Sequence, residues 1–139
     1  MAPMLAGDRA PGLRRGAPTM PRYEIDGHEV TLISGPHFTT AELRAAVEAA
    51  IADRAFEAPM TLILDVRESR ESASRDEIAT RIALFARRKA YFRPRIAIIV
   101  SRMLHYGLAR MASMMGDGQG VTIGVFYDLD EARRWQSQA

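Results

Sequence analysis

Three side chains suited to acyl-transfer chemistry fall at or near the ends of predicted strands. Asp65 lies near the end of the apolar segment 60–66, Ser101 ends the segment 95–101, and His105 follows four residues later. A serine nucleophile, a histidine base and an orienting aspartate form the triad that cleaves esters and amides. No Gly-x-Ser-x-Gly turn surrounds Ser101, although that turn exposes the nucleophile in α/β hydrolases. We therefore keep hydrolysis as an alternative, and we predict no catalytic residue and no enzymatic activity.

Two serines before a predicted helix are candidate phosphoacceptors, Ser74 and Ser72. A phosphate at a helix N-terminus is stabilised by free amides and by the helix dipole, and Arg70 and Arg75 lie nearby in the sequence. Ser74 also has Glu77 three residues later, which is the pattern of a capping box. Capping is the favoured interpretation of Ser74, and a phosphoserine switch stays an alternative.

The histidines and the glycine-rich run predict neither a metal site nor a nucleotide site. His28, His37 and His105 lack the H-x-x-x-H and H-E-x-x-H spacings of metal-binding helices. The run at 116–120 closes a predicted helix, whereas a dinucleotide-binding loop opens one. The chain has no cysteine, which excludes disulfides and Cys-ligated zinc. We predict no metal and no cofactor.

A methionine-rich helix is predicted at residues 103–115. Its main apolar face consists of Leu104, Leu108, Met111 and Met115. Met103 and Met114 widen the apolar arc beyond what docking on a sheet needs, and methionine makes an adaptable surface. One interpretation is a helix buried in the core. The other assigns Met103, Met111 and Met114 to a small apolar pocket or to the contact with a partner, including a second copy of the chain.

The elements that position these residues follow from hydrophobic periodicity and from turn and capping signals. Strands are predicted at 23–25, 28–34, 60–66, 95–101 and 121–127, with a hairpin turn at Asp26-Gly27. Helices are predicted at 39–53, 75–89, 103–115 and from Asp128 onward, the first two with capping boxes. The order β-β-α-β-α-β-α-β-α predicts an α/β fold with four helices and a mixed five-stranded sheet whose later strands are parallel.

The carboxyl ends of the parallel strands are the predicted ligand-binding edge, because ligands of open α/β sheets bind there. The candidate ligand-binding residues at this edge are Asp65, Ser101, His105, Tyr127 and Asp128.

Residues 1–21 form a predicted disordered tail, since they contain proline and glycine but little apolar patterning. Met20 is an alternative start of the chain. The tail carries three arginines and one aspartate, which accounts for the net charge of +2. Residues 22–138, the predicted domain, are therefore electrically balanced and lack the phosphate-driven attraction of nucleic-acid-binding proteins. We expect no nucleic-acid partner.

The sequence shows no pattern typical of a transmembrane helix or of a secretory signal. No apolar run reaches the ~20 residues of a transmembrane helix, and the N-terminal residues do not read as a secretory signal. We therefore expect no transmembrane segment and a cytoplasmic location.

Three stretches of the sequence resemble the STAS-like (SpoIIAA-like) family, which is often grouped with SEC14-type domains. They are 62–65 (LILD), 88–100 (RKAYFRPRIAIIV) and 125–135 (VFYDLDEARRW). Together with the element order, the resemblance covers roughly residues 22–138. It implies the SpoIIAA-like fold. The leading functional hypothesis is a non-enzymatic STAS-like domain, regulatory in role, that binds a partner protein or a small apolar, lipid-like ligand.

The chain departs from this family at one functional point. Anti-sigma-antagonist members carry an Asp-Ser-(Ser)-Gly phosphoacceptor motif at the start of the second helix. Residues 68–76 read ESRESASRD, with serines but without the Asp-Ser pair and the glycine. This difference places the phosphoserine-switched regulator second to the ligand-binding or partner-binding domain, and a small serine hydrolase third.

Overall fold

The computed structural model describes residues 13–16, 21–70 and 73–138. The strands are β1 (Leu13–Arg15), β2 (Arg22–Asp26), β3 (Glu29–Ile33), β4 (Thr61–Asp65), β5 (Arg95–Ile99) and β6 (Thr122–Phe126). The helices are α1 (Thr40–Ala52), α2 (Arg75–Arg87), α3 (Met103–Asp117) and α4 (Leu129–Ser137), with a short 3-10 turn, η2 (Lys89–Tyr91), after α2.

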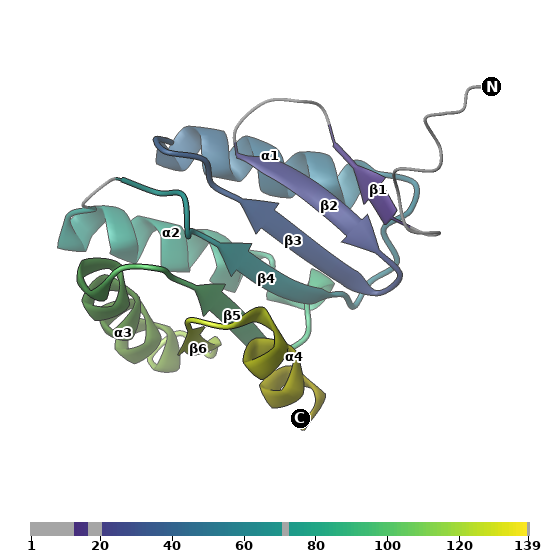
Figure 1. Ribbon diagram of the computed structural model, residues 1–139. Coiled ribbons are helices and arrows are strands. Elements are labelled where there is room, and N and C mark those ends of the chain that lie inside the picture. Colours follow the sequence, from purple (N-terminus) through teal and green to yellow (C-terminus); the bar gives the residue numbers. More distant parts are fainter. Residues whose placement is uncertain (1–12, 17–20, 71–72, 139) are drawn as a thin grey trace.

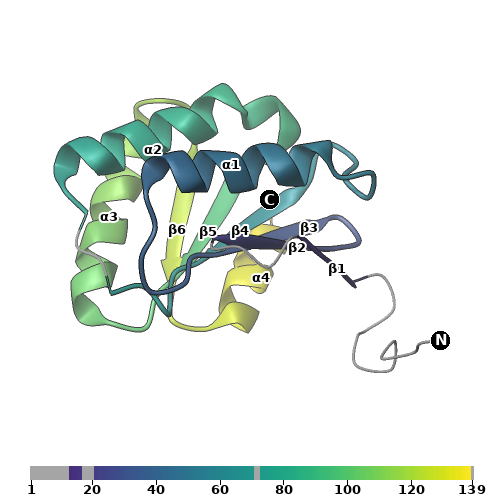
Figure 2. The same ribbon diagram turned by 90° about the horizontal axis from the view of Figure 1, so that it is seen from above.

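One mixed sheet organises the fold, with its strands in sequence order from β1 to β6. β1, β2 and β3 pair antiparallel, whereas β3, β4, β5 and β6 pair parallel. Figure 1 shows the sheet with α1 and α2 behind it, and Figure 2 shows α4 on the opposite face. The predicted α/β fold, the four helices and the parallel later strands are confirmed.

The sheet has six strands and not the predicted five. The added strand, β1, lies inside the segment predicted to be a disordered tail, and it pairs with β2 from Leu13↔Asp26 to Arg15↔Glu24. The proline and glycine in the flanking sequence suggested disorder. A three-residue edge strand also has too few residues to show a hydrophobic pattern, because it forms by pairing with another segment. Gly16 and Pro21 are also described, whereas residues 1–12 and 17–20, including Met20, lie outside the described residues.

A buried carboxylate joins β1 to the end of α1. The Asp53 carboxylate accepts hydrogen bonds from Arg14 Nε at 2.6 Å, from the Tyr23 hydroxyl at 2.7 Å and from the Ala55 N–H at 2.9 Å. Burial by itself raises the pKa of Asp53, but these three donors outweigh it and hold the pKa below its ordinary value. The charged form of Asp53 therefore stabilises the folded state.

Two predicted boundaries moved by one or two residues. Asp26 pairs with Glu29, so the hairpin turn is Gly27-His28, with Gly27 at a φ of 61°. Helix α3 continues through Gly116 to Asp117. A Cβ atom on Gly116 would lie 2.7 Å from a backbone oxygen of the chain that returns to β6. Glycine is needed at position 116 for space and not as the helix cap.

Both predicted capping boxes are confirmed, and they fix where α1 and α2 begin. The Ser74 hydroxyl accepts from the Glu77 N–H at 3.1 Å, while the Glu77 carboxylate accepts from the Ser74 N–H at 3.0 Å. Thr39 and Glu42 form the same pair at the start of α1. These bonds satisfy backbone donors that the first turn of a helix otherwise leaves open.

The two faces of the sheet carry cores of unequal size. The larger core lies under α1, α2 and α3 and includes Val30, Leu62 and Ile98. The smaller core, under α4, centres on Ile63 and Ile99. Because successive side chains of a strand point to opposite faces, the continuous apolar sequence of β4 and β5 supplies both cores.

Replacing the hydroxyl of Ser74 tests the capping interpretation. We expect Ser74→Ala to lower the free energy of unfolding by about 1 kcal/mol, because the Glu77 N–H loses its acceptor. Ser74→Asp retains an N-cap acceptor and should unfold like the wild type in urea. Equal midpoints for Ser74→Ala and the wild type would show that the cap contributes nothing.

Acid titration of stability tests the Asp53 cluster. A carboxyl whose folded-state pKa is lowered contributes stability above its unfolded-state pKa, about 3.9, and loses it as the pH falls through the folded-state value. The stability difference between the wild type and Asp53→Asn should therefore be largest at neutral pH and shrink in acid. Glu57→Gln, on an exposed loop, is the control. It should leave the fall of the free energy of unfolding in acid the same as in the wild type.

Candidate functional site

An apolar cavity of about 130 Å³ lies between the sheet and the helices α1, α2 and α3. Its floor includes Leu32, Leu64 and Ile98, one residue from each of three neighbouring parallel strands. Leu64 is in the middle of the sheet, yet it is only partly buried. The helices above β4 therefore leave part of this strand's apolar surface uncovered.

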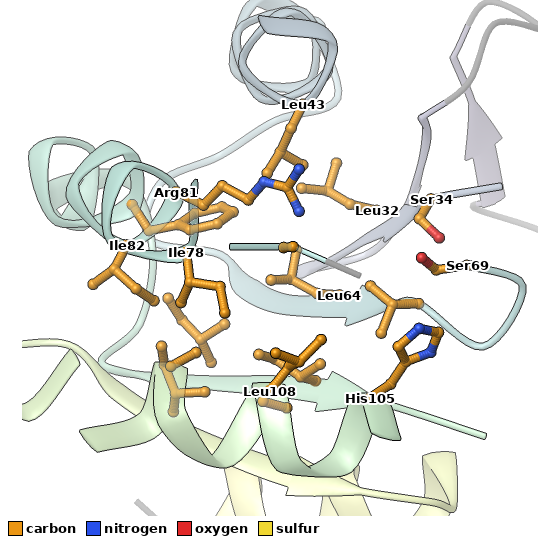
Figure 3. A pocket seen from close by; sticks show the side chains of 18 of the residues that line it. Leu32, Ser34, Leu43, Leu64, Ser69, Ile78, Arg81, Ile82, His105 and Leu108 are labelled. Carbon is orange, nitrogen blue, oxygen red and sulfur yellow. The ribbon is translucent and has the colours of Figure 1, made fainter. Parts of the chain in front are cut away.

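Helix α3 forms one wall of the cavity with His105, Leu108, Ala109 and Ala112, and α2 forms another with Ile78, Arg81 and Ile82. Figure 3 shows Ile78 and Ile82 of α2 on one side of Leu64 and Leu108 of α3 on another. Ala109 and Ala112 of α3 are buried members of the larger core.

Four polar side chains interrupt the apolar lining: Ser34, Ser69, Arg81 and His105. In Figure 3 the hydroxyls of Ser34 and Ser69 face each other, and the imidazole of His105 lies on the same side of the cavity. The Ser34 hydroxyl donates to the Gly35 carbonyl at 2.9 Å. All three side chains are buried, so this end of the cavity can offer hydrogen bonds to a polar atom.

Arg81 is the one side chain of the lining that is charged at every physiological pH. Its side chain is 14% exposed. Arg81 Nε donates to Thr40 Oγ1 at 3.0 Å, and the guanidinium carbon lies 4.4 Å from the centre of the Phe38 ring. These contacts fix the guanidinium between the beginning of α1 and the cavity.

A second polar cluster lies at the carboxyl edge of the sheet and is centred on Arg67. Asp65 accepts from Arg67 Nε at 2.9 Å and from a terminal nitrogen at 2.7 Å, while Ser101 donates to the Arg67 carbonyl at 2.8 Å. The hydrogen bond that Arg67 donates to Asp65 raises the pKa of the Arg67 guanidinium, and the charge of Asp128 adds to the effect. The strand-end candidates Asp65, Ser101 and Asp128 are thus gathered around one arginine.

A polar cleft adjoins this cluster. Its lining consists of Pro36, Arg67, Glu68, Ser69, Arg70 and Arg102. Ser69 lines both the cleft and the apolar cavity, so the two spaces lie on either side of the loop that follows β4.

The triad residues do not form a hydrogen-bonded chain. His105 is buried in the lining of the apolar cavity, whereas Ser101 is exposed and bound to a backbone carbonyl. Asp65 is engaged by Arg67. The hydrolase alternative needs Ser101 next to His105 and His105 next to Asp65. In the structure, Ser101 and Asp65 contact Arg67 instead.

The remaining candidates lie on the surface. Tyr127 is exposed, and its ring stacks on Tyr106 with centroids 5.3 Å apart. Asp128 caps α4 by accepting from the Asp130 N–H at 3.2 Å. Met103 and Met114 are 85% and 74% exposed.

Met111 packs against the larger core, and none of the three candidate methionines lines the cavity. The methionine hypothesis assigned the same residues to an apolar pocket or to a partner contact. In the structure these two surfaces lie on different faces of α3. Met103 and Met114 are on the outer face of α3, while the inner face of the same helix lines the apolar space.

Ser74 lies at the start of α2 in the capping box described above, and Ser72 lies outside the described residues. Within residues 13–16, 21–70 and 73–138, no group of three or more His, Asp or Glu side chains is placed to hold a metal ion. No helix of the described part of the chain is long and apolar enough to cross a membrane.

Sequence analysis did not identify Arg81, Ser34 or Ser69 as site residues. Ser34 and Ser69 follow β3 and β4, so the rule that selected Asp65 and Ser101 could have found them. Arg81 gave no such signal, because Glu77 and Arg81 have the i, i+4 spacing of an ordinary surface ion pair.

The comparisons with known proteins return a solved structure but no sequence relative. No protein-family model and no curated protein matches the sequence. Among solved structures, an uncharacterised protein of the DUF3478 family with a SpoIIAA-like fold, from Shewanella loihica PV-4, matches at 18% sequence identity and a TM-score of 0.49. The match covers 88% of this chain and 90% of the other.

Proposed function

We propose that this chain is a non-enzymatic, STAS-like binding domain whose ligand is a small apolar molecule held in the cavity above β4. The observation that carries the proposal is the cavity itself, about 130 Å³ and lined almost entirely by aliphatic and aromatic side chains. Ligand sites have this character, with a few polar groups that orient the ligand.

The volume limits the size of the ligand. An engineered protein cavity of about 150 Å³, lined by Leu, Ile and Phe, stays dry and binds benzene. A cavity of about 130 Å³ therefore suits one six-membered ring or a chain of about six carbons.

Helix α3 offers a route from ligand binding to a regulatory role. Its inner residues Leu108 and Ala109 line the cavity, while Met103 and Met114 face outward. A ligand that packs against the inner face changes the position or the mobility of this helix, and a protein partner bound to the outer face would sense that change. The exposed methionines give such a partner an adaptable apolar surface.

Thermal unfolding in the presence of hexan-1-ol and of benzene tests the cavity. A ligand at ten times its dissociation constant stabilises the folded state by about 1.4 kcal/mol, which raises Tm by about 4 °C for a domain of this size. Ala109→Leu places three further carbons in the cavity and should abolish the shift. Ala49→Leu makes the same change on the exposed face of α1 and should keep it.

The absence of any shift in the wild type, for both probes, would contradict the proposal. So would an equal shift in Ala109→Leu that retains its far-UV circular dichroism, because the probe would then bind elsewhere.

An esterase assay tests the non-enzymatic assignment. We expect the rate of p-nitrophenyl acetate hydrolysis to be the same for the wild type, Ser101→Ala and His105→Gln, since Ser101 donates to the Arg67 carbonyl and His105 is buried in the cavity lining. A loss of more than about tenfold in both variants, the effect of removing a nucleophile or its base, would instead identify a hydrolase.

A further inference from the structure

The polar cleft at the carboxyl edge of the sheet is a second space, separate from the apolar cavity. Its volume is about 510 Å³, which lies within the range of roughly 300–1,000 Å³ that is typical of small-molecule sites. Its lining contains three arginines, Arg67, Arg70 and Arg102, and one acid, Glu68. Residues 22–138 carry equal numbers of basic and acidic side chains, so the cleft is a local excess of positive charge.

Hydrogen bonds join the three loops that form the cleft. The Arg70 N–H donates to the Pro36 carbonyl at 2.9 Å, which ties the loop after β4 to the loop after β3. The Ser101 hydroxyl donates to the Arg67 carbonyl at 2.8 Å, which ties the same loop to the loop after β5. Arg102 follows Ser101 directly, so the backbone of all three arginines is held in place before a ligand arrives. A site organised in advance loses less entropy on binding.

The three arginines differ in the partners they already have. Arg67 donates two hydrogen bonds from its side chain to Asp65, at 2.9 and 2.7 Å. Arg70 and Arg102 are exposed, and within residues 13–16, 21–70 and 73–138 neither of them forms an ion pair. The charge of Glu68 offsets only one of these two cations. The cleft therefore presents two guanidiniums whose donors are open to an anion.

A phosphomonoester suits two guanidiniums better than a carboxylate does. It carries a charge of about −1.5 to −2 at pH 7 and three strong acceptor oxygens. One guanidinium binds two such oxygens through parallel N–H donors, so two arginines can share one phosphate group. A carboxylate has one charge and two oxygens. A single exposed ion pair contributes little, whereas several charges in a network contribute more.

We propose that the cleft binds the phosphate group of a phosphomonoester, with Arg70 and Arg102 donating hydrogen bonds to its oxygens while Arg67 stays paired with Asp65. The volume of about 510 Å³ exceeds the space that a phosphate group occupies, so the cleft also holds the part of the molecule that carries the phosphate. This inference concerns a second space and does not depend on the apolar cavity.

A titration followed by proton–nitrogen correlation NMR tests the site, because backbone amides report where a ligand binds. The probes are glucose 6-phosphate, gluconate and glucose at equal ionic strength and a pH of about 8, above the second pKa of a phosphate, about 6. We expect glucose 6-phosphate to shift the amides of residues 67–70 and 102. Its affinity should be about tenfold higher than that of gluconate, the effect of one added hydrogen bond to a charged group. Glucose should not bind.

Four variants locate the phosphate. Arg70→Gln and Arg102→Gln should each weaken the binding of glucose 6-phosphate about tenfold, and the double variant should abolish it. Arg87→Gln makes the same change of net charge at the exposed last turn of α2, outside the cleft lining, and should bind like the wild type. Glu68→Gln removes the one acid of the lining and should tighten binding about threefold.

A phosphomonoester belongs either to a soluble molecule or to the lipid phosphatidic acid, and a vesicle assay distinguishes these sources. The protein is sedimented with phosphatidylcholine vesicles that contain or lack phosphatidic acid. Binding of glucose 6-phosphate without sedimentation assigns the site to a soluble ligand. Sedimentation that needs both phosphatidic acid and the pair Arg70 and Arg102 assigns it to the lipid head group.

Four results would overturn the proposal. Equal affinities of the wild type for glucose 6-phosphate and gluconate would remove the phosphate preference. Equal weakening in Arg87→Gln and Arg70→Gln would show that the anion responds only to net charge. Shifted amides that all lie outside the cleft would place the anion elsewhere. No binding of glucose 6-phosphate or of phosphatidic acid vesicles would leave the cleft without a phosphate site. The wild-type comparisons decide even if a variant does not fold.

Discussion

The parallel pairing of four neighbouring strands, β3 to β6, is the constraint on which the rest of the structure depends. It brings the carboxyl ends of these strands to one edge of the sheet, so the loops that follow them meet there. Arg67 follows β4 and Ser101 follows β5, and they are joined by a hydrogen bond although they are far apart in the sequence. The same pairing requires each strand to return through a helix, which places α1, α2 and α3 over one face.

The capping boxes connect this edge to the cavity. Ser74 and Thr39 fix the first residues of α2 and α1, and both helices begin where the parallel strands end. Arg81, two helical turns beyond Ser74, then reaches Thr40 at the start of α1. A shift of either helix by one residue would rotate its side chains by about 100°, and this contact would be lost. The orientation of the charged group therefore depends on two local hydrogen-bonding patterns.

Local signals in the sequence predicted most of the fold. The capping pairs, the apolar strands and the Asp26-Gly27 region were visible because each depends on residues only a few positions apart. Strand β1 was not, since it forms through pairing with β2 and through the distant contact of Arg14 with Asp53. The cavity was not visible either. A filled and an unfilled core share one hydrophobic pattern, and the difference lies in the sizes and positions of side chains that come from several distant elements.

The energetics of the cavity bear on whether it is a site or an imperfection of packing. Sealed, empty volume in a protein core costs about 24 cal/mol per Å³, which sets an upper bound of about 3 kcal/mol on the cost of a space of about 130 Å³. That is a large share of the 5–15 kcal/mol by which a domain is typically stable. An aliphatic side chain in place of Ala109 would recover part of this cost, and so would an apolar ligand whose hydrocarbon atoms fill the space. A chain that keeps alanine at this position therefore keeps the space open to a ligand.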